Sequence, residues 1–81
     1  MRLFYTDRFL KSYEQAPAAI QAAFDRRVPL LLANLRHPSL RAKKYDEARG
    51  IWQARVTRDW RFYFTIEDDT YYLLDMISHP K

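Results

Sequence analysis

The segment WRFYFTI, residues 60–66, restricts the possible folds more than any other part of this sequence. Polar or half-polar side chains at Arg61, Tyr63 and Thr65 alternate there with large apolar ones, a period of two that is typical of a β-strand. The apolar set consists of Trp60, Phe62, Phe64 and Ile66. The segment therefore predicts a sheet with one packed face and one face that is available for function.

Two further strands are predicted beside this one. Residues 51–57 also alternate, and Arg58-Asp59 can form a tight turn between them and residues 60–66. Residues 67–69 provide a second acidic turn, which leads into a strand at 70–77. The expected arrangement is a three-stranded antiparallel meander.

A short strand and two helices are predicted before the meander. Residues 2–5 can form the strand, and Thr6 or Asp7 then offers a side-chain oxygen to the first amides of a helix. Pro17 ends that helix and is expected to be the first residue of the next one. The apolar face expected for the first helix consists of Phe9, Leu10 and Tyr13.

The second helix is predicted from an apolar stripe with spacings of three and four residues. Its members are Ile20, Ala23, Phe24, Val28, Leu31, Leu32 and Leu35. Pro29 lies inside the stripe and predicts a kink near residues 25–29. His37-Pro38 ends the helix, and residues 38–50 are expected to be a connection without regular structure. The predicted fold is α+β, with a two-helix hairpin packed on one face of the sheet.

Length and composition exclude several classes of protein. A chain of 81 residues is expected to form one domain, and without cysteine it has neither disulfides nor a thiolate metal site. Two histidines with different neighbours do not predict a zinc site. Because no signal peptide is recognisable and the longest apolar run, residues 28–33, is too short to span a membrane, a cytoplasmic protein is expected.

The net charge of +4 is concentrated in one segment. Residues 36–49 contain five basic and two acidic side chains, which gives this segment a net charge of +3. Such a segment suits a polyanion, namely RNA, DNA or an acidic protein, although a solvated basic loop has the same composition.

Several stretches of the chain resemble one known family. They are YTDRFLKSY at the start, the helical hairpin, NLRHPSL, IWQARVTRDWRFYF and the final ISH. Over nearly its whole length, the chain resembles the RelE/ParE superfamily of toxins from bacterial type II toxin-antitoxin modules. The resemblance implies a single toxin domain at residues 1–81. The resemblance implies a metal-independent endoribonuclease without a cofactor that cuts mRNA, often on the ribosome. It also implies a cognate antitoxin that wraps around the toxin in a hetero-oligomer.

Three residues match the catalytic roles that the resemblance implies. Arg61 corresponds to the strand arginine that stabilises the phosphate in the transition state, and His79 to the C-terminal histidine that serves as the acid. Glu47 is the candidate general base, from the connection where some family members place a carboxylate. A structural alternative is an ion pair across the sheet between Asp75 and either Arg55 or Arg61, and for His79 the alternative is a solvated chain end.

Four more residues are candidate RNA contacts. Arg55 is expected on the same sheet face as Arg61, Lys43 and Lys44 lie in the basic segment, and Tyr63 could stack on a base. Each of the charged residues could instead be a solvated surface charge. The lysines that some family members carry before the strand arginine are replaced here by tryptophan and alanine, and the usual aromatic residue after the C-terminal histidine is missing.

Two alternatives to an RNase are consistent with the same resemblance. The ParE branch of the superfamily inhibits DNA gyrase and does not cleave RNA, so the fold alone does not decide the activity. An inactive module that only binds its antitoxin is the other alternative. Because an acid-base histidine is of no use to a gyrase inhibitor, the presence of both Arg61 and His79 favours the nuclease.

Overall fold

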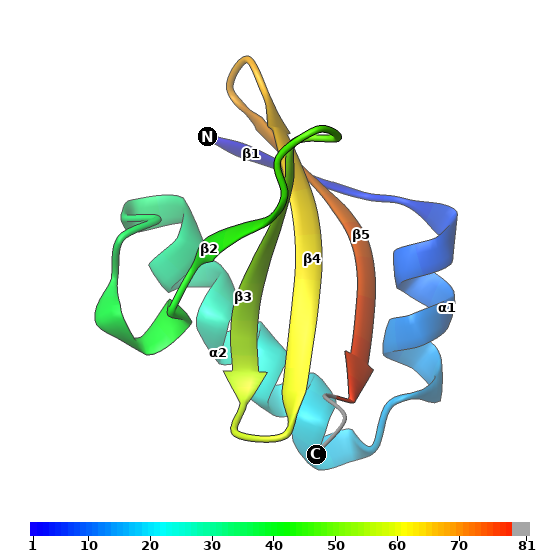
Figure 1. Ribbon diagram of the computed structural model, residues 1–81. Helices are drawn as coiled ribbons and strands as arrows, with labels where there is room; N and C mark the ends of the chain where they lie inside the picture. The colour runs from blue at the N-terminus through cyan, green and yellow to red at the C-terminus, as the bar shows by residue number, and fades with distance from the viewer. Residues whose placement is uncertain (79–81) are drawn as a thin grey trace.

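The chain folds into a five-stranded sheet with two helices packed against one of its faces (Figure 1). The structure is a computed structural model, and it describes residues 1–78. The elements in chain order are β1 (Arg2–Tyr5), α1 (Asp7–Gln15), α2 (Ala18–Ala33), a 3-10 turn (Pro38–Leu40), β2 (Lys43–Asp46), β3 (Ile51–Thr57), β4 (Trp60–Glu67) and β5 (Thr70–Ser78). The predicted α+β class is confirmed.

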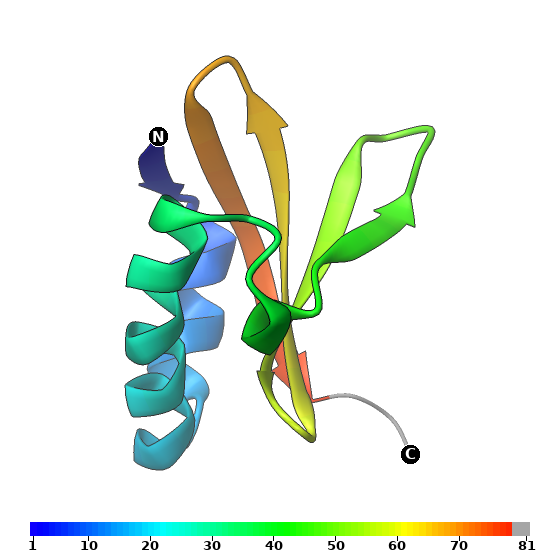
Figure 2. The ribbon, with the colours of Figure 1, turned by 90° about the vertical axis from the view of Figure 1, so that its left-hand side faces the viewer.

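The strand order in the sheet is β1-β5-β4-β3-β2. The three strands predicted as an antiparallel meander, β3, β4 and β5, pair as expected. β1 adds to the edge of β5 as a parallel strand, and both helices lie in the connection between β1 and the rest of the sheet. The helices form a separate layer behind the sheet, as Figure 2 shows.

The prediction that residues 38–50 form an irregular connection was wrong. They contain the 3-10 turn and β2, which pairs with β3 in antiparallel orientation. The register of this pair shifts between Lys44 and Asp46, so Tyr45 is an extra residue in the strand. This bulge interrupts the alternation of side chains, which is why the strand has no period-two pattern in the sequence.

β1 pairs only with the first half of β5, and α1 lies beside the second half. Thr6 makes the transition: its hydroxyl donates to the carbonyl of Leu73 at 2.7 Å and accepts from the amide of Phe9 at 3.2 Å, which caps α1. The predicted capping role of Thr6 is confirmed. The same transition brings the first two turns of α1 next to residue 75 on β5.

The two helices form the predicted hairpin with a narrower apolar face than expected. Pro17 is the residue before α2 rather than its first residue, and α2 continues across Pro29 without a break. Leu10 and Leu32 were expected in the apolar faces, yet their side chains are 46% and 39% exposed. Each is adjacent in sequence to a buried residue, and one step along a helix turns a side chain by about 100° away from the core.

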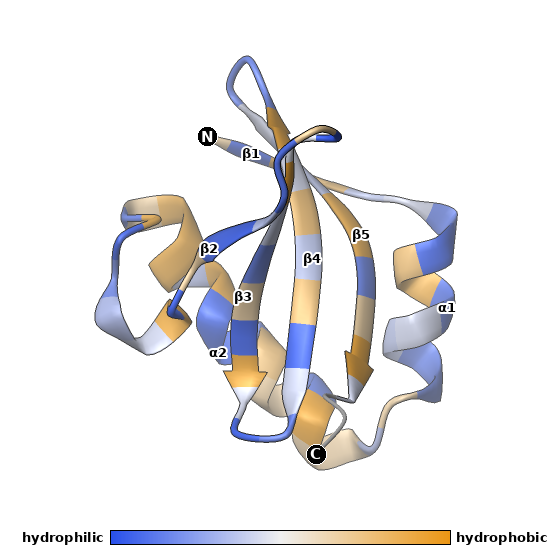
Figure 3. Ribbon diagram, in the orientation of Figure 1, coloured by the Kyte–Doolittle hydropathy of each residue, from blue (hydrophilic) through white to orange (hydrophobic). Residues whose placement is uncertain are grey.

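The core is an aromatic layer between the helices and the sheet. Phe24 of α2 contacts Phe9 of α1 and Phe62 of β4, with ring centroids 5.1 and 5.2 Å apart. The buried side chains on the sheet alternate with polar ones, and these bands are visible along β3 and β4 in Figure 3. No helix within residues 1–78 has the length and apolar character needed to cross a membrane.

Candidate functional site

The face of the sheet that points away from the helices carries four of the predicted site residues, Arg55, Arg61, Lys43 and Tyr63, in two neighbouring rows. Residues directly opposite each other on paired strands point to the same face, so the register fixes the rows. The first row consists of Arg55, Arg61 and Ile77, on β3, β4 and β5. The second row consists of Lys43, Gln53, Tyr63 and Asp75. We call this surface the open face.

Arg55 and Arg61 stand directly opposite each other on β3 and β4. Like charges in this position destabilise a sheet. The shielding of Arg55 from solvent lowers its pKa, and the neighbouring cations lower it further. These cations, in order of decreasing effect, are Arg41, Arg61, Arg27 and Arg58. Together with Arg55 they form what we call the arginine cluster.

No anion within residues 1–78 compensates the charge of Arg55. Its buried Nε atom has no hydrogen-bond partner in that part of the chain. The predicted alternative, an ion pair between Asp75 and either Arg55 or Arg61, is wrong, because the carboxylate of Asp75 binds Arg8 instead. An arrangement of this kind disfavours folding slightly and favours binding of a polyanion.

Arg61 also holds the turn between β3 and β4. Its Nη1 atom donates to the carbonyls of Thr57, Arg58 and Trp60 at 2.8, 3.0 and 3.0 Å. These bonds fix the orientation of the guanidinium, so its donors are oriented before any ligand arrives. Arg61 therefore has a structural contact that sequence reasoning did not anticipate.

Two further members of the cluster come from outside the meander. Arg27 of α2 donates from Nε to the carbonyl of Val56 at 3.1 Å, which ties the helix to β3. Arg41 follows the 3-10 turn with a φ of 47°, in the left-handed region. His37 accepts a hydrogen bond from the amide of Ser39 on Nδ1 and so starts that turn.

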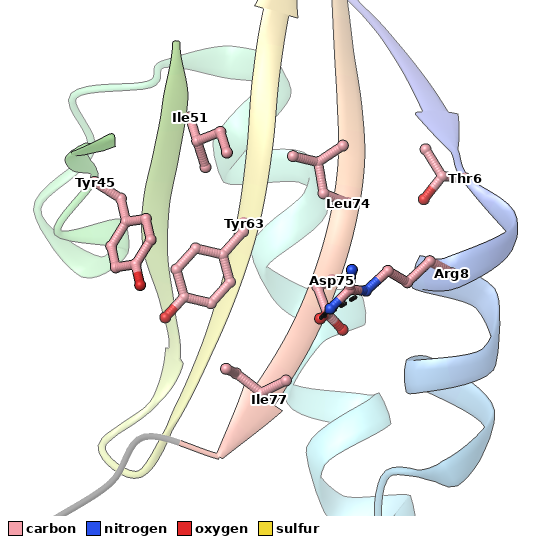
Figure 4. Close-up of a pocket in the computed structure, with 8 residues that line it drawn as sticks. All are labelled: Thr6, Arg8, Tyr45, Ile51, Tyr63, Leu74, Asp75 and Ile77. Carbon is pink, nitrogen blue, oxygen red and sulfur yellow. Dashed lines mark hydrogen bonds and ion pairs between the residues drawn. The ribbon is translucent and has the colours of Figure 1, made fainter. Parts of the chain in front are cut away.

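A pocket of about 480 Å³ lies on the open face beside the cluster (Figure 4). It is lined by Thr6, Arg8, Tyr45, Ile51, Tyr63, Leu74, Asp75 and Ile77. The rings of Tyr45 and Tyr63 meet edge to face, with centroids 4.9 Å apart. Burial raises the pKa of Tyr63, Tyr45 and Asp75 raise it further, and Arg61 acts in the opposite direction, so the phenol remains a neutral donor.

Arg8 and Asp75 form a fixed pair at the α1 side of this pocket. Nε and Nη2 of Arg8 lie 3.2 and 3.1 Å from Oδ2 of Asp75. The other carboxylate oxygen accepts from the hydroxyl of Ser12 and from the amide of Met76. Asp75 is thereby held from two elements at once.

Not all of the remaining predicted site residues lie near the arginine cluster. Lys43 belongs to the open face, whereas Lys44 points to the other face, where its Nζ lies 5.2 Å from the centroid of the Trp52 ring. Glu47 lies in the turn between β2 and β3, and from Ile51 at the start of β3 to Arg55 the strand spans about 13 Å. The structure therefore does not bring Glu47 next to the arginines.

His79 lies outside the described residues. Within residues 1–78, no group of three or more histidine, aspartate or glutamate side chains is placed to hold a metal ion.

Sequence reasoning missed five residues that line the pocket or surround Arg55, namely Arg8, Arg27, Arg41, Arg58 and Tyr45. Arg41 and Tyr45 lie in the basic segment that was singled out for its charge, so part of the signal was present. Arg8 and Arg27 lie on helices, and their positions depend on how α1 and α2 pack against the sheet. Nothing in their local sequence distinguishes them from other surface arginines.

Neither a protein-family model nor a curated protein matches the chain. Solved structures do match it. The RelE–RelB complex from Pyrococcus horikoshii has a TM-score of 0.80 at 15% identity, over 99% of this chain and 96% of that one. The YoeB/ParE toxin from Agrobacterium tumefaciens has a TM-score of 0.78 at 15% identity, over 99% of this chain and 100% of that one. YafQ from E. coli has a TM-score of 0.77 at 19% identity, over 96% and 93%. At identities this low, the likeness establishes a shared fold.

Proposed function

Because the chain has the RelE/ParE fold, which the resemblance in its sequence predicted, we propose that it is the toxin of a toxin–antitoxin pair. We propose further that it is an endoribonuclease that cleaves mRNA without a metal ion. The observation that carries the second step is the arginine cluster, in which Arg55 and Arg61 face each other without a counter-ion within residues 1–78.

The proposed reaction is attack of a ribose 2′-oxygen on the adjacent phosphorus. The bond from phosphorus to the 5′-oxygen breaks, which leaves a 2′,3′-cyclic phosphate and a 5′-hydroxyl end. One proton leaves the attacking hydroxyl and another reaches the leaving oxygen. Between these states the phosphorus is pentacoordinate and carries additional negative charge, so cations placed there lower the barrier.

We assign the binding of this phosphate to Arg55 and Arg61, which face each other on β3 and β4. A guanidinium can donate two parallel hydrogen bonds to phosphate oxygens, and the bonds of Arg61 to the turn hold it in place beforehand. Lys43 and Tyr63 on the neighbouring row would contact the adjoining nucleotide. Lys44 remains a proposed RNA contact. Because its side chain points to the other face of the edge strand β2, it would contact RNA that extends beyond the edge of the sheet.

The proton transfers are assigned from the family resemblance. His79 is the proposed acid, and its position lies outside the described residues. Glu47 is the proposed base and lies at the far end of β3 from Arg55, so the substitution Glu47→Gln tests that assignment directly. A normal cleavage rate in this variant would remove Glu47 from the mechanism.

The proposed protein partner is an antitoxin with acidic or apolar docking segments. The RelE proteins of Pyrococcus horikoshii and Methanococcus jannaschii were solved in complex with RelB antitoxins. In this chain, the arginine cluster and the basic segment offer a surface of complementary charge to such a partner.

Cleavage of an mRNA fragment tests the nuclease assignment. The protein should cut the fragment in the presence of a chelator, either alone or once ribosomes are added, and it should leave a 2′,3′-cyclic phosphate. The matched control is the same fragment with a single 2′-deoxy nucleotide at the cut, which should resist cleavage because the nucleophile is gone. Cutting of the deoxy fragment at that position would contradict the mechanism. Inhibition of purified DNA gyrase without RNA cleavage would support the ParE-type alternative.

A further inference from the structure

We propose that the pocket on the open face is a nucleobase subsite that selects guanine, with Arg8 as the reading residue and Asp75 as its positioning residue. This inference rests on the proposed function, because it takes single-stranded RNA as the ligand. It adds a specificity determinant on α1 and β5, on the other side of the pocket from the basic segment.

The first support is the way in which Asp75 holds Arg8. The carboxylate of Asp75 is largely buried, with a side-chain exposure of 17%, and it receives two donors on each oxygen. It is saturated and cannot itself bind a base. Arg8, in contrast, is 80% exposed although one edge of its guanidinium is fixed. A long side chain in solvent that is oriented in advance suits recognition more than stability.

The second support is the geometry of the donors that remain. Arg8 uses Nε and Nη2 toward Asp75, so the opposite edge, formed by Nη1 and the second hydrogen of Nη2, points away from the carboxylate. This edge carries two parallel donors and matches two adjacent acceptors. Guanine presents such a pair in O6 and N7, whereas adenine presents one acceptor beside one donor and uracil presents no two adjacent acceptors. Cytosine presents a pair, O2 and N3, on its Watson–Crick edge, but its single ring stacks on less of the pocket wall than a purine does.

The third support is the composition of the pocket walls. The rings of Tyr45 and Tyr63 form one side, and Ile51, Leu74 and Ile77 add apolar surface. As Figure 4 shows, Arg8 reaches from the start of α1 toward Asp75 at the opposite side from the two tyrosines. Aromatic and apolar walls stack against any base, so the walls provide affinity and Arg8 provides the choice between bases.

The fourth support is the distance from the arginine cluster. Tyr63 and Asp75 belong to the row next to Arg61, and adjacent rows on one sheet face are about 7 Å apart. A phosphate on Arg55 and Arg61 and a base in the pocket can therefore belong to the same or the neighbouring nucleotide. The pocket is thus placed to determine which nucleotide is presented at the cut.

Binding of short RNA that cannot be cleaved tests this proposal. The probes are uridine hexamers in which every 2′-hydroxyl is methylated, with one central position changed to guanine, adenine or cytosine. The guanine probe should bind about fivefold to a hundredfold more tightly than the other three, the range expected for one bidentate contact to a base. Equal binding of the four probes would overturn the proposal.

Variants of Arg8 locate the effect. Arg8→Lys keeps the charge but not the two-pronged edge, so it should lose the guanine preference and keep its affinity for the uridine hexamer. Arg8→Gln should lose the preference and also some affinity. The matched control is Arg26→Gln, an equal loss of charge at an exposed position on α2, which should keep the guanine preference. A guanine preference that persists in Arg8→Lys would show that another residue reads the base. A loss of affinity in Arg8→Gln that is equal for all four probes would show that Arg8 contacts phosphate. Either result would overturn the assignment.

The outcome is independent of the cleavage assay. A guanine preference that depends on Arg8, in a protein that does not cut unmodified RNA, would support the pocket and remove the proposed nuclease. Cleavage of unmodified RNA together with equal binding of the four probes would support the nuclease and remove the guanine pocket. Loss of antitoxin binding in Arg8→Lys, with no change for RNA, would assign the pocket to the protein partner and overturn the inference.

Discussion

At the scale of single residues, the site contains a side chain, Arg55, whose placement costs stability. Arg55 and Arg61 repel each other across two strands, and Arg55 has a buried donor without a partner within residues 1–78. Residues selected only for folding would place opposite charges or apolar side chains in such a row. The proposed binding of a phosphate between the two arginines would make the arrangement favourable.

The substitution Arg55→Met should separate function from folding. Methionine keeps the unbranched stem as far as the position of Nε and removes the charge, so thermal stability should stay the same or rise. RNA binding should weaken for all sequences, and the slope of log affinity against log salt concentration should become shallower by about 0.7, the value for one phosphate contact to a single strand. Thermal denaturation and binding at several salt concentrations measure both effects. An unchanged slope would show that Arg55 does not contact phosphate.

Arg61 should behave differently, because it has two roles. Arg61→Ala loses the three bonds to the turn and should lower the free energy of unfolding by about 1 kcal/mol, or roughly 4–8 °C in melting temperature. The single-turnover cleavage rate per folded molecule should fall by about a hundredfold or more. Arg61→Lys should recover only part of the rate, since an ammonium lacks the planar fork. If Arg61→Ala melts early and still cuts at the parental rate, its role is structural alone.

At the scale of secondary structure, the sequence predicted the elements whose side chains follow a clear period. The meander, the two helices and the N-terminal strand are confirmed because their apolar residues repeat every two or every three to four positions. β2 was missed because it is short, polar and interrupted by the bulge at Tyr45. The exposure of Leu10 and Leu32 depends on the rotation of each helix against the sheet, which is a tertiary property.

The hairpin of α1 and α2 is closed by a hydrogen bond whose strength depends on pH. The hydroxyl of Tyr13 donates to both carboxylate oxygens of Asp25, at 2.9 and 3.0 Å. This bond is the main cause of the raised pKa of Tyr13, followed by burial and by the charges of Asp25 and Tyr5. The folded state therefore keeps a proton that the unfolded state loses near pH 10.0, so this stabilisation is complete below pH 10.0 and declines as the pH rises further.

Tyr13→Phe should lower the free energy of unfolding at neutral pH by about 0.5–1.5 kcal/mol, the usual net value of such a bond. It should also make the alkaline loss of stability smaller than in the parent. Part of that loss should remain, because the pKa values of Tyr5, Tyr63 and Tyr71 are raised as well. Urea denaturation on both sides of pH 10.0 measures this, with Tyr72→Phe as the control for removal of a hydroxyl. An identical alkaline profile in Tyr13→Phe and the parent would contradict the assignment.

At the scale of the whole molecule, the fold brings the basic side chains of several elements to the pocket on the open face and to the surroundings of Arg55. Arg8 comes from α1, Arg27 from α2, Arg41 from the connection, and Arg55 and Arg61 from the meander. The sequence predicted the arginines of the meander, since strand parity fixes their face. It could not predict the arginines that the helices and the connection contribute. The charge of the site therefore depends on the complete tertiary structure.

This distribution of charge leads to a prediction for the living cell. Expression of the chain alone should stop growth by blocking protein synthesis, because a nuclease of this kind removes mRNA while DNA replication continues. Pulse labelling with an amino acid and with thymidine should show that amino-acid incorporation falls first. Arg61→Lys and Arg55→Met should relieve the arrest, whereas Arg26→Met, an equal loss of charge on the exposed side of α2, should not. If a neighbouring reading frame encodes the proposed antitoxin, its co-expression should restore growth. The two proteins should then co-purify in a salt-sensitive complex, since the proposed partner would neutralise the same cations. If thymidine incorporation falls first, the chain acts on DNA topology as a ParE-type toxin. The arginine cluster would then be a surface for that protein target rather than for RNA.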